Sequence, residues 1–239
     1  MSYEERTYRL LINKDNLISY NVIVAESDLL ISSDTNLIDC ARKLLINHRY
    51  SLEIYIKRHS EFRTSLFPLP VDNLAPHIIR DMLEKTNICG VGPMASVAGA
   101  ISEFLGYDLL NYTENLIIEN GGDIFLRSKN KLTVSVYAGK SDLNYKVNFI
   151  VNTADTPLGI CTSSATVGPS LSFGKADAVC VISPSATLAD AAASAIGNRV
   201  KSKKDIKSGL DYGIKIPGVK GIIIIFGNDL GVIGEVQLI

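Results

Sequence analysis

The sequence predicts an α+β fold in which mixed, mostly antiparallel sheets pack against helices. Short runs of β-branched and aromatic residues are joined by polar or glycine-containing turns, a pattern typical of antiparallel strands. Longer stretches, two of them rich in alanine, carry apolar residues at helical spacing. No linker or low-complexity tract divides the 239 residues, so we expect a single domain over residues 1–239, or two intertwined halves.

The chain is expected to begin with antiparallel strands. Runs rich in β-branched and aromatic residues predict strands at Tyr8–Ile12 and Tyr20–Ala25, and Leu29–Ser32 continues the pattern. Asp34 is placed to cap the helix that follows. Apolar residues recur at helical spacing from there to beyond Tyr55, which predicts one long helix.

Two further helices are predicted before the middle of the chain. The segment Phe67–Pro70 breaks the structure, and Pro76 is suited to the first turn of another helix. Gly90–Pro93 reads as a tight turn, and it is followed by an Ala-rich helix from Met94 to about Phe104. The small residues of this helix allow close approach of a neighbouring backbone or of a ligand.

The second half is predicted to combine strands with a second Ala-rich helix. The expected elements are strands at Asn115–Glu119, Ile124–Arg127, Leu132–Tyr137, Lys146–Val151 and Ala178–Ile182, a helix at Ala186–Ile196, a helical turn at Asp205–Leu210, and strands at Gly221–Phe226 and Gly231–Gln237. The hydroxyl-rich stretch Thr162–Ser172 is expected to interrupt them. In each half of the chain an Ala-rich helix precedes an apolar strand. The strand of the first half lies in the segment IIENGGD, and the strand of the second half lies in the segment IIFGNDLG. The echo is compatible with an internal duplication, although helix–strand pairs of this kind are common.

Composition and charge limit the functional classes. The chain is 46% hydrophobic and 21% charged with a net charge of -1, which is ordinary for a soluble globular protein. The near-neutral balance argues against a nucleic-acid partner. The short basic cluster at Lys201, Lys203 and Lys204 is interpreted as a solvated surface segment, with anion binding as the alternative.

Neither a zinc site nor a membrane span is predicted. The four cysteines and three histidines have no zinc-like spacing, which favours buried free thiols. The polar start argues against a signal peptide, and the longest apolar run, Gly221–Phe226, is too short to cross a bilayer. We therefore expect a cytoplasmic protein with a small-molecule ligand and no membrane partner, and oligomerisation is an open alternative.

Two glycine-containing turns are candidate ligand contacts. Gly92 precedes a predicted helix, whose exposed N–H groups and dipole would favour an anion, although a plain turn is the alternative. Gly121 and Gly122 follow a buried strand and would let a ligand approach the backbone. Asp123 adds a carboxylate for a ribose hydroxyl, an adenine amine or a metal. Gly-Gly between strands is also typical of a hairpin turn.

Hydroxyl groups are concentrated after Cys161. Thr162 and Ser163 begin a run of four hydroxyl residues in five positions, which could form a nest for phosphate. The later segment GPSLSFGK superficially resembles a P-loop, but its glycine spacing and the alanine after its lysine exclude that motif. Lys175 could still neutralise a phosphate, and Asp177 could bind a metal or pair with Lys175.

The second Ala-rich helix carries a candidate metal site. Asp190 and Ser194 are four residues apart and therefore lie on one helix face. A carboxylate and a hydroxyl one turn apart offer two hard oxygen ligands to Mg²⁺ or Ca²⁺. The alternative is that Asp190 favours the N-terminal turn of the helix and Ser194 faces a neighbouring helix.

Together these segments resemble the ApbE-like family, whose best-known members are FAD:protein FMN transferases. The resemblance lies in GVGPMASVAGAISEFLG, which is similar to the Gly-rich opening of a long helix in that family, in LIIENGGDIFL, which is similar to its Gly-Gly-Asp turn, and in SPSATLADAAASAIG, which is similar to its A-D-x-x-x-[ST]-A helix. The three segments follow one another in the family order within residues of about 90 to 200. The chain looks like a short branch of that family.

The resemblance implies a flavin nucleotide site between the two halves of an α+β fold. It implies that Asp190 and Ser194 hold Mg²⁺, with backbone atoms of Gly159–Ser163 completing the metal shell. It also implies that the turn Gly121–Asp123 contacts the nucleotide of FAD or FMN. The implied chemistry is phosphoryl transfer, in which Mg²⁺ neutralises the pyrophosphate and FMN passes to a Thr or Ser of a target protein.

The chain also departs from the transferase pattern. It lacks the Met-Gly-Thr segment of the family and the loop that carries its His and its D-P-x-T-G motif, and the matching interval is only Val167–Lys175. Two hypotheses follow: a metal-dependent protein that binds a flavin or nucleotide and is FMN transferase-like, or a non-catalytic ligand-binding or assembly protein with a decayed transferase site. A small hydrolase is less favoured, because no nucleophile–His pair is evident. Thr166 lacks the motif of a flavin acceptor.

Overall fold

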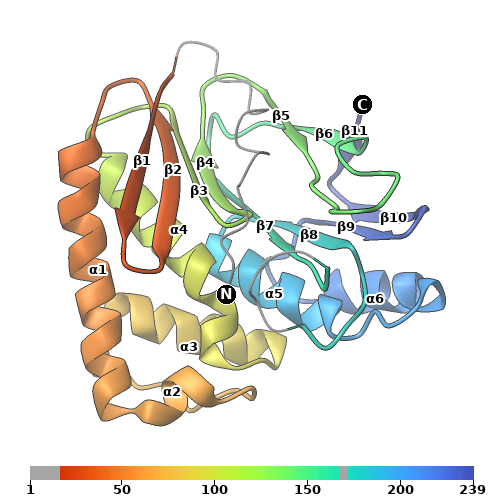
Figure 1. The fold of residues 1–239 in the computed structure, drawn as a ribbon, viewed down its shortest axis with the longest axis horizontal. Helices are drawn as coiled ribbons and strands as arrows, with labels where there is room; N and C mark the ends of the chain where they lie inside the picture. Colours follow the sequence, from red (N-terminus) through yellow and green to blue (C-terminus); the bar gives the residue numbers. More distant parts are fainter. Residues whose placement is uncertain (1–16, 167–171) are drawn as a thin grey trace.

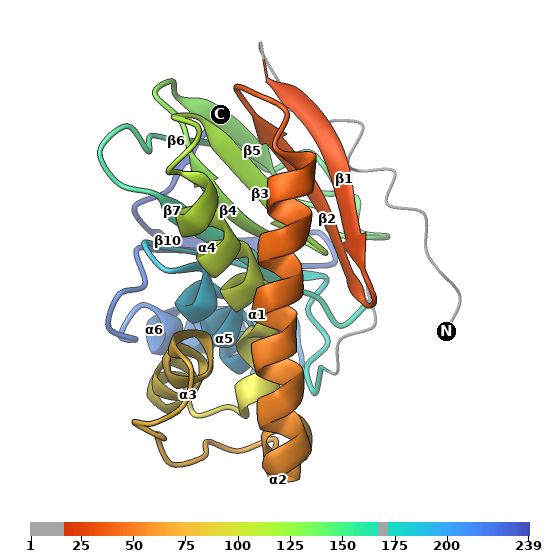
Figure 2. The same ribbon diagram turned by 90° about the vertical axis from the view of Figure 1, so that its left-hand side faces the viewer.

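The fold has three layers, with an antiparallel sheet of eight strands in the middle. The computed structural model describes residues 17–166 and 172–239. Within these residues, helices cover one face of the large sheet and a three-stranded sheet covers part of the other (Figure 1). Figure 2 shows the long first helix standing alongside the first two strands, on the helical side of the sheet.

The strands of the large sheet follow the order of the chain with a single interruption. In spatial order they are β1 (Ile18–Val24), β2 (Ser27–Ser33), β3 (Leu116–Asn120), β4 (Asp123–Arg127), β7 (Leu158–Ser163), β8 (Ala178–Ser183), β9 (Gly221–Phe226) and β10 (Asp229–Gly234). The small sheet has the order β11 (Gln237–Leu238), β6 (Asn148–Val151), β5 (Leu132–Ser135). Every neighbouring pair is antiparallel, and the interruption between β4 and β7 is the excursion that forms β5 and β6.

Six α-helices lie in the described part of the chain. They are α1 (Ile38–Arg58), α2 (Ser60–Thr64), α3 (His77–Cys89), α4 (Val97–Leu109), α5 (Ala186–Gly197) and α6 (Ile206–Gly213). Single 3₁₀ turns at Pro93–Ser96 and Lys203–Asp205 lead into α4 and α6. No single described helix is long and apolar enough to cross a membrane; α3 and the run Pro93–Leu109 pass that criterion only as a pair bent by 100°.

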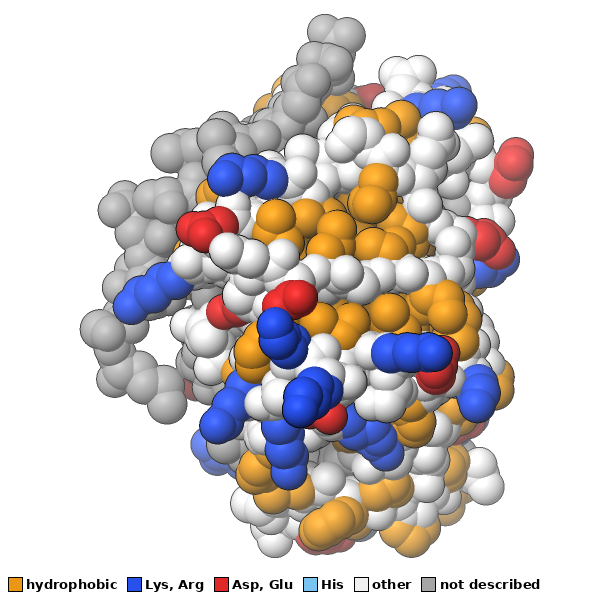
Figure 3. Space-filling model, turned by 90° about the vertical axis from the view of Figure 1, so that its right-hand side faces the viewer, with side chains coloured by type: hydrophobic (Ala, Val, Ile, Leu, Met, Phe, Trp, Pro, Cys, Tyr) orange, Lys and Arg blue, Asp and Glu red, His pale blue; other side chains and the backbone are white. Residues whose placement is uncertain are grey.

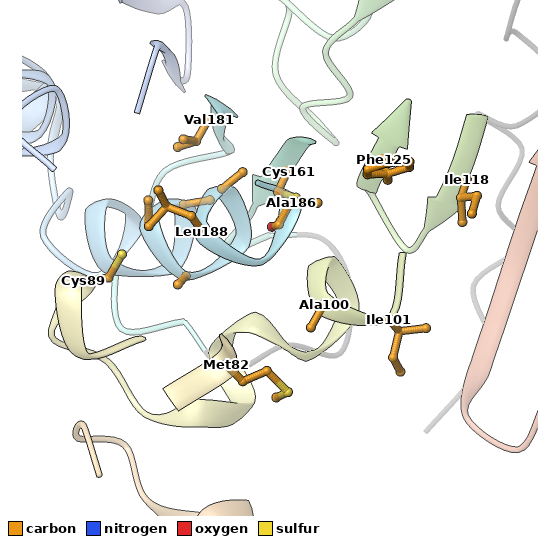
Figure 4. Packing of buried hydrophobic residues seen from close by; sticks show 14 of the residues in the cluster. Met82, Cys89, Ala100, Ile101, Ile118, Phe125, Cys161, Val181, Ala186 and Leu188 are labelled. Carbon is orange, nitrogen blue, oxygen red and sulfur yellow. The ribbon is translucent and has the colours of Figure 1, made fainter. Parts of the chain in front are cut away.

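Side-chain alternation along the strands creates two hydrophobic cores. In β3, Leu116 and Ile118 face the helices, whereas Ile117 faces the small sheet. The larger core lies between the sheet and the helices, and Figure 4 shows residues of α3, α4, α5, β4 and β7 meeting there. Because strands buried on both faces can be apolar throughout, β8 and β9 are almost continuously hydrophobic.

The predicted α+β fold, the long first helix and both Ala-rich helices are confirmed. The expected strand at Tyr8–Ile12 lies outside the described residues. The expected final strand Gly231–Gln237 is instead two strands, β10 and β11, which belong to different sheets. The strand β7 is absent from the expected elements, and its last two residues, Thr162 and Ser163, belong to the stretch that is expected to interrupt the strands.

The prediction that Asp34 caps the first helix is wrong. Helix α1 begins after Leu37 without a side-chain cap. The Asp34 carboxylate instead accepts hydrogen bonds from the backbone N–H groups of Glu114 and Asn115, at 3.0 and 2.8 Å. These partners lie about 80 residues away in the sequence, and Asp34 therefore holds the start of β3 beside the end of β2.

Candidate functional site

Helices α4 and α5 come into very close contact at Gly99. A Cβ atom placed on Gly99 would lie 2.3 Å from the carbonyl oxygen of Ala186 and 2.8 Å from the Cβ of Asp190, so only glycine fits. This approach lets Oδ2 of Asp190 accept the backbone N–H of Gly99 at 2.9 Å. Since the first N–H groups of a helix have no partner within it, Asp190 caps α4 from the neighbouring helix.

A second carboxylate caps α5 in return. Oε2 of Glu103, in the buried face of α4, accepts hydrogen bonds from the Thr187 N–H at 2.8 Å and from the hydroxyls of Thr187 and Ser185 at 2.9 Å each. Burial raises the pKa of Glu103, against the opposing effect of these hydrogen bonds. Each helix therefore supplies an acidic side chain to the N-terminus of the other, which fixes Asp190 relative to α4.

The glycine pair between β3 and β4 forms the tip of a hairpin. Asn120 pairs with Asp123, which leaves Gly121 and Gly122 as a two-residue turn with φ of +68° and +100°. A turn with positive φ at both central residues favours glycine at each. The nearest atom to a Cβ built on Gly122 is the carbonyl oxygen of Thr162, at 3.8 Å, so the space beside the hairpin tip is open. The hairpin interpretation is confirmed, and contact with a ligand stays a prediction.

Asp123 and Asp190 form a pair of acidic side chains between β4 and α5. Asp123 is only 8% exposed, and burial and then the charge of Asp190 raise its pKa. Hydrogen bonds from the Cys161 thiol and the Thr162 N–H oppose this rise. Burial likewise raises the pKa of Asp190, against the N–H groups of Gly99 and Ala98. A proton or a cation would relieve the repulsion between the two carboxylates.

Strand β7 brings its backbone and alternate side chains to this pair. Cys161 lies opposite Asp123 in the sheet, and its sulfur is 3.3 Å from the carbonyl oxygen of Ala186, so its single thiol hydrogen is shared between this carbonyl and Asp123. Figure 4 shows Cys161 beside Ala186 at the start of α5. Ser163 faces the same side, because its hydroxyl would lie 3.5 Å from a Cβ on Gly197 at the end of α5. Asp190 and Ser194 lie between these two contacts along α5.

Thr162 points to the other face of the sheet. It is paired with Cys180, which belongs to the core beneath the small sheet, and the Thr162 side chain hydrogen-bonds the Cys180 thiol. Since neighbouring residues in a strand alternate between faces, Thr162 and Ser163 cannot place their hydroxyls in one phosphate nest. Only the main chain of Thr162 reaches Asp123 and the hairpin tip.

The structure gives local contacts for three further candidates, and their contact with a ligand stays a prediction. A Cβ on Gly92 would lie 1.9 Å from the carbonyl oxygen of Ser65, so this glycine permits loop packing, and the α4 terminus is already capped by Asp190. Lys175 is exposed, and its N–H donates to Val200 at 2.8 Å. Asp177 accepts the N–H of Gly227 at 2.7 Å and a hydroxyl of Thr166 at 3.3 Å, instead of pairing with Lys175.

The structure adds residues that were not selected from the sequence. Asn120 donates its side-chain amide to the Ala98 carbonyl at 3.2 Å, and Glu103 and Cys161 contact α5 as described. Gly99 had a visible signal, since a glycine inside a helix is costly and marks a close approach. Nothing in the sequence around Glu103 or Cys161 indicated which distant elements they contact.

The chemistry of these donors fits a divalent cation. Asp190 and Asp123 provide carboxylate oxygens whose repulsion a cation would relieve, and Ser194 provides a hydroxyl one helical turn from Asp190. In the described part of the chain, however, no group of three or more His, Cys, Asp or Glu side chains is spaced to hold a metal ion. Further ligands would therefore have to come from main-chain oxygens, hydroxyls, water or the bound phosphate.

Solved structures of flavin transferases share this fold. The chain is similar to the flavin transferase ApbE from Vibrio cholerae, with a TM-score of 0.58, 11% sequence identity and coverage of 92% of this chain and 97% of that chain. It is also similar to the flavinyl transferase ApbE of Pseudomonas stutzeri in its apo form, with a TM-score of 0.56, 13% identity and coverage of 91% and 94%. The architecture is therefore that of an ApbE-like α+β protein.

The sequence comparison specifies the family. The family model described as AbpE bacteria matches residues 9–212, and the chain belongs to that family. Among its relatives, the UPF0280 protein of Methanococcus aeolicus is 39% identical over 208 residues, covering 85% of this chain and 84% of the relative. The UPF0280 protein of Methanococcus vannielii is 37% identical over 226 residues, covering 92% of each. The resemblance inferred from the three sequence segments is thus confirmed.

Proposed function

We propose that this protein binds a flavin or another nucleotide phosphate ligand together with a divalent metal, at the junction of β4, β7 and α5. The observation that carries the proposal is the Asp123–Asp190 pair beside an open glycine hairpin. Two carboxylates held together away from water attract a divalent cation. The open space beside Gly122 gives a ligand access to the backbone.

The residues have separate roles in this proposal. Asp190 and Ser194 would hold the metal, with Asp123 as a further acidic group, and a bound Mg²⁺ would supply charge neutralisation for phosphate oxygens. Gly121 and Gly122 would contact the ligand through the backbone. Ser163, near the end of α5, is placed to donate its hydroxyl to a phosphate oxygen.

Binding can be measured by calorimetric titration of FAD, FMN and ATP, each with and without Mg²⁺. The key variant is Asp190→Asn, because the asparagine oxygen can still accept the Gly99 N–H and keep α4 capped. We expect Asp190→Asn to weaken metal-dependent binding more than about tenfold, which corresponds to about 1.4 kcal/mol. Failure of the wild-type protein to bind any of the three nucleotides would overturn the proposal.

Asp177→Asn is the matched control. Asp177 also accepts a backbone N–H, that of Gly227, but it lies in a different part of the fold. This variant should lose a comparable hydrogen bond to a charged group and yet bind Mg²⁺ and nucleotide as the wild type does. Equal losses in both variants would point to general destabilisation instead of a metal site at Asp190.

A second candidate function is non-catalytic binding by a decayed transferase site. It is favoured by the interval between β7 and β8, which contains no His, and by the lack of a cluster of three metal-ligating side chains in the described chain. Incubation with FAD, Mg²⁺ and a threonine-containing acceptor peptide separates the two functions. Release of AMP with FMN on the peptide supports transfer, whereas tight nucleotide binding without AMP supports the non-catalytic function.

A further inference from the structure

Strand β10 forms one edge of the large sheet in the described chain. It pairs with β9 through a two-residue turn, and Phe226 and Asp229 close the hairpin. In such a hairpin the closing pair exchanges hydrogen bonds and the next pair does not. The N–H and C=O groups of Leu230 and Val232 therefore point away from β9, along the outer edge of the sheet.

The edge has little of the protection that exposed strands commonly carry. Edge strands are usually blocked by Lys, Pro or a covering segment. The sequence of β10, DLGVIG, contains no Lys or Pro, and its only charge is at its first residue. Leu230 is 41% exposed, and it lies with the partly buried Val232 on the face of the strand that is turned toward the small sheet. An added strand would find both hydrogen-bonding groups and apolar side chains here.

The opposite face of the same edge is bordered by positive charge. Gly231 lies under Ile206, the first residue of α6, and Lys203 is 3.9 Å from the carboxylate of Asp229. The segment 199–207, to which Lys203 and Ile206 belong, reads RVKSKKDIK, with five cationic side chains and one aspartate. Figure 3 shows Lys and Arg side chains grouped beside apolar ones on this side of the molecule.

We propose that β10 is the docking edge for an extended segment of a partner protein in which acidic and apolar residues alternate. Added to β10, such a segment would place every second side chain on the helical face, beside the lysines, and the others beside Leu230 and Val232. A second copy of this chain fits less well, because a two-fold contact through β10 would bring two sets of lysines together. The proposal concerns a surface separate from the nucleotide site and does not depend on it.

Two synthetic peptides with the same strand pattern test the proposal, one alternating Glu with Val and the other alternating Lys with Val. Binding is followed by the backbone amide signals of ¹⁵N-labelled protein and by hydrogen exchange. The Glu–Val peptide should bind and protect the amides of Leu230 and Val232, with an affinity that falls as salt is added. The Lys–Val peptide should bind at least about tenfold more weakly.

Variants and the oligomeric state complete the test. Reversal of charge in Lys203→Glu with Lys207→Glu should invert the preference between the peptides, whereas Lys43→Glu on the exposed side of α1 should not. Val232→Pro should abolish binding of the Glu–Val peptide, because it removes an outward N–H that β9 does not use. Equal binding of both peptides, protection elsewhere, or a dimer in solution that Val232→Pro dissociates would overturn the proposal.

Discussion

Asp190 of α5 accepts the backbone N–H of Gly99 of α4 at 2.9 Å, although the two residues are 91 positions apart in the sequence. The carboxylate that resembles the metal ligand of ApbE-like proteins is therefore also the cap of a neighbouring helix. One of its oxygens holds α4, and the group is close enough to Asp123 for the two charges to repel. The contact with Gly99 therefore fixes the position of the Asp190 carboxylate beside Asp123.

Filling the space at Gly99 should disturb both folding and ligand binding. In Gly99→Ala the new methyl group would collide with the main chain of Ala186 and with Asp190, which neither helix can avoid without moving. We expect a loss of about 1–3 kcal/mol in the free energy of unfolding, measured by urea denaturation. We also expect weaker Mg²⁺-dependent nucleotide binding. The control is Gly209→Ala in α6, where the atoms nearest the new methyl group belong to the side chains of Val200, Ile224 and Ile196 and not to the main chain. A wild-type affinity in Gly99→Ala would contradict this prediction.

A methyl group at the hairpin tip should affect the ligand more than the fold. Gly122→Ala meets no close atom, but it forces alanine to adopt φ of +100°, at a cost of about 1–2 kcal/mol. Gly227→Ala at the β9–β10 turn has similar free space and a φ of +58°, which alanine adopts at lower cost, so this variant controls for a methyl group added to a hairpin turn. Calorimetry should detect weaker nucleotide binding only in Gly122→Ala. Similar nucleotide affinities in the two variants would show that the hairpin at Gly121 and Gly122 does not contact the ligand.

Glu103 should make stability depend on pH. Burial raises its pKa from the ordinary value of 4.5, so the protonated form is favoured in the folded protein. The resulting stabilisation is complete below the unfolded pKa and is lost as pH rises through the folded pKa. Relative to Glu103→Gln, the wild type should thus become less stable as the pH is raised from the ordinary value of 4.5 toward neutrality. Urea denaturation across this range measures the difference in unfolding free energy between the two proteins. A difference that does not change with pH would refute the raised pKa of Glu103.

Only one thiol should react in the folded protein. Cys89, Cys161 and Cys180 are buried, and burial raises the pKa of Cys89 and of Cys180 to about 12. Because the thiolate is the reactive form, these groups should resist a thiol reagent such as DTNB. Cys40, on α1, is partly exposed and should react. We expect DTNB to titrate one thiol per chain under native conditions and four in urea. Reaction of Cys161 in the folded protein would contradict this prediction and show that the core beside Asp123 opens.

Elements with a strong local pattern could be predicted from the sequence. The turn at Gly121 and Gly122 follows an apolar run, and α5 begins at a serine that caps it and continues with alanines. Both features lie within a few residues of one another, so spacing alone identifies them. The family motifs then associated Asp123 with Asp190, and the structure places these side chains near each other.

The contacts that depend on distant segments could not be predicted in this way. Asp34 had the spacing of a helix cap, but its partners belong to the start of β3. Gly92 precedes a helix, but its close contact with Ser65 depends on a loop that local spacing does not reveal. Thr162 belongs to strand β7, whose hydroxyl residues are not typical of a buried strand. Because side chains alternate along a strand, the Thr162 side chain lies on the face of the sheet opposite Cys161 and Ser163.

The exchange of caps between α4 and α5 has a consequence for biosynthesis. Helix α4 is translated long before Asp190. While β3 to β8 are being synthesised, the N–H of Gly99 therefore lacks its Asp190 acceptor, and the surface around Gly99 lacks the helix that packs against it. Ribosome-bound chains that stop before α5 should consequently expose this apolar helix to chaperones, and release should follow only when the second Ala-rich segment leaves the exit tunnel.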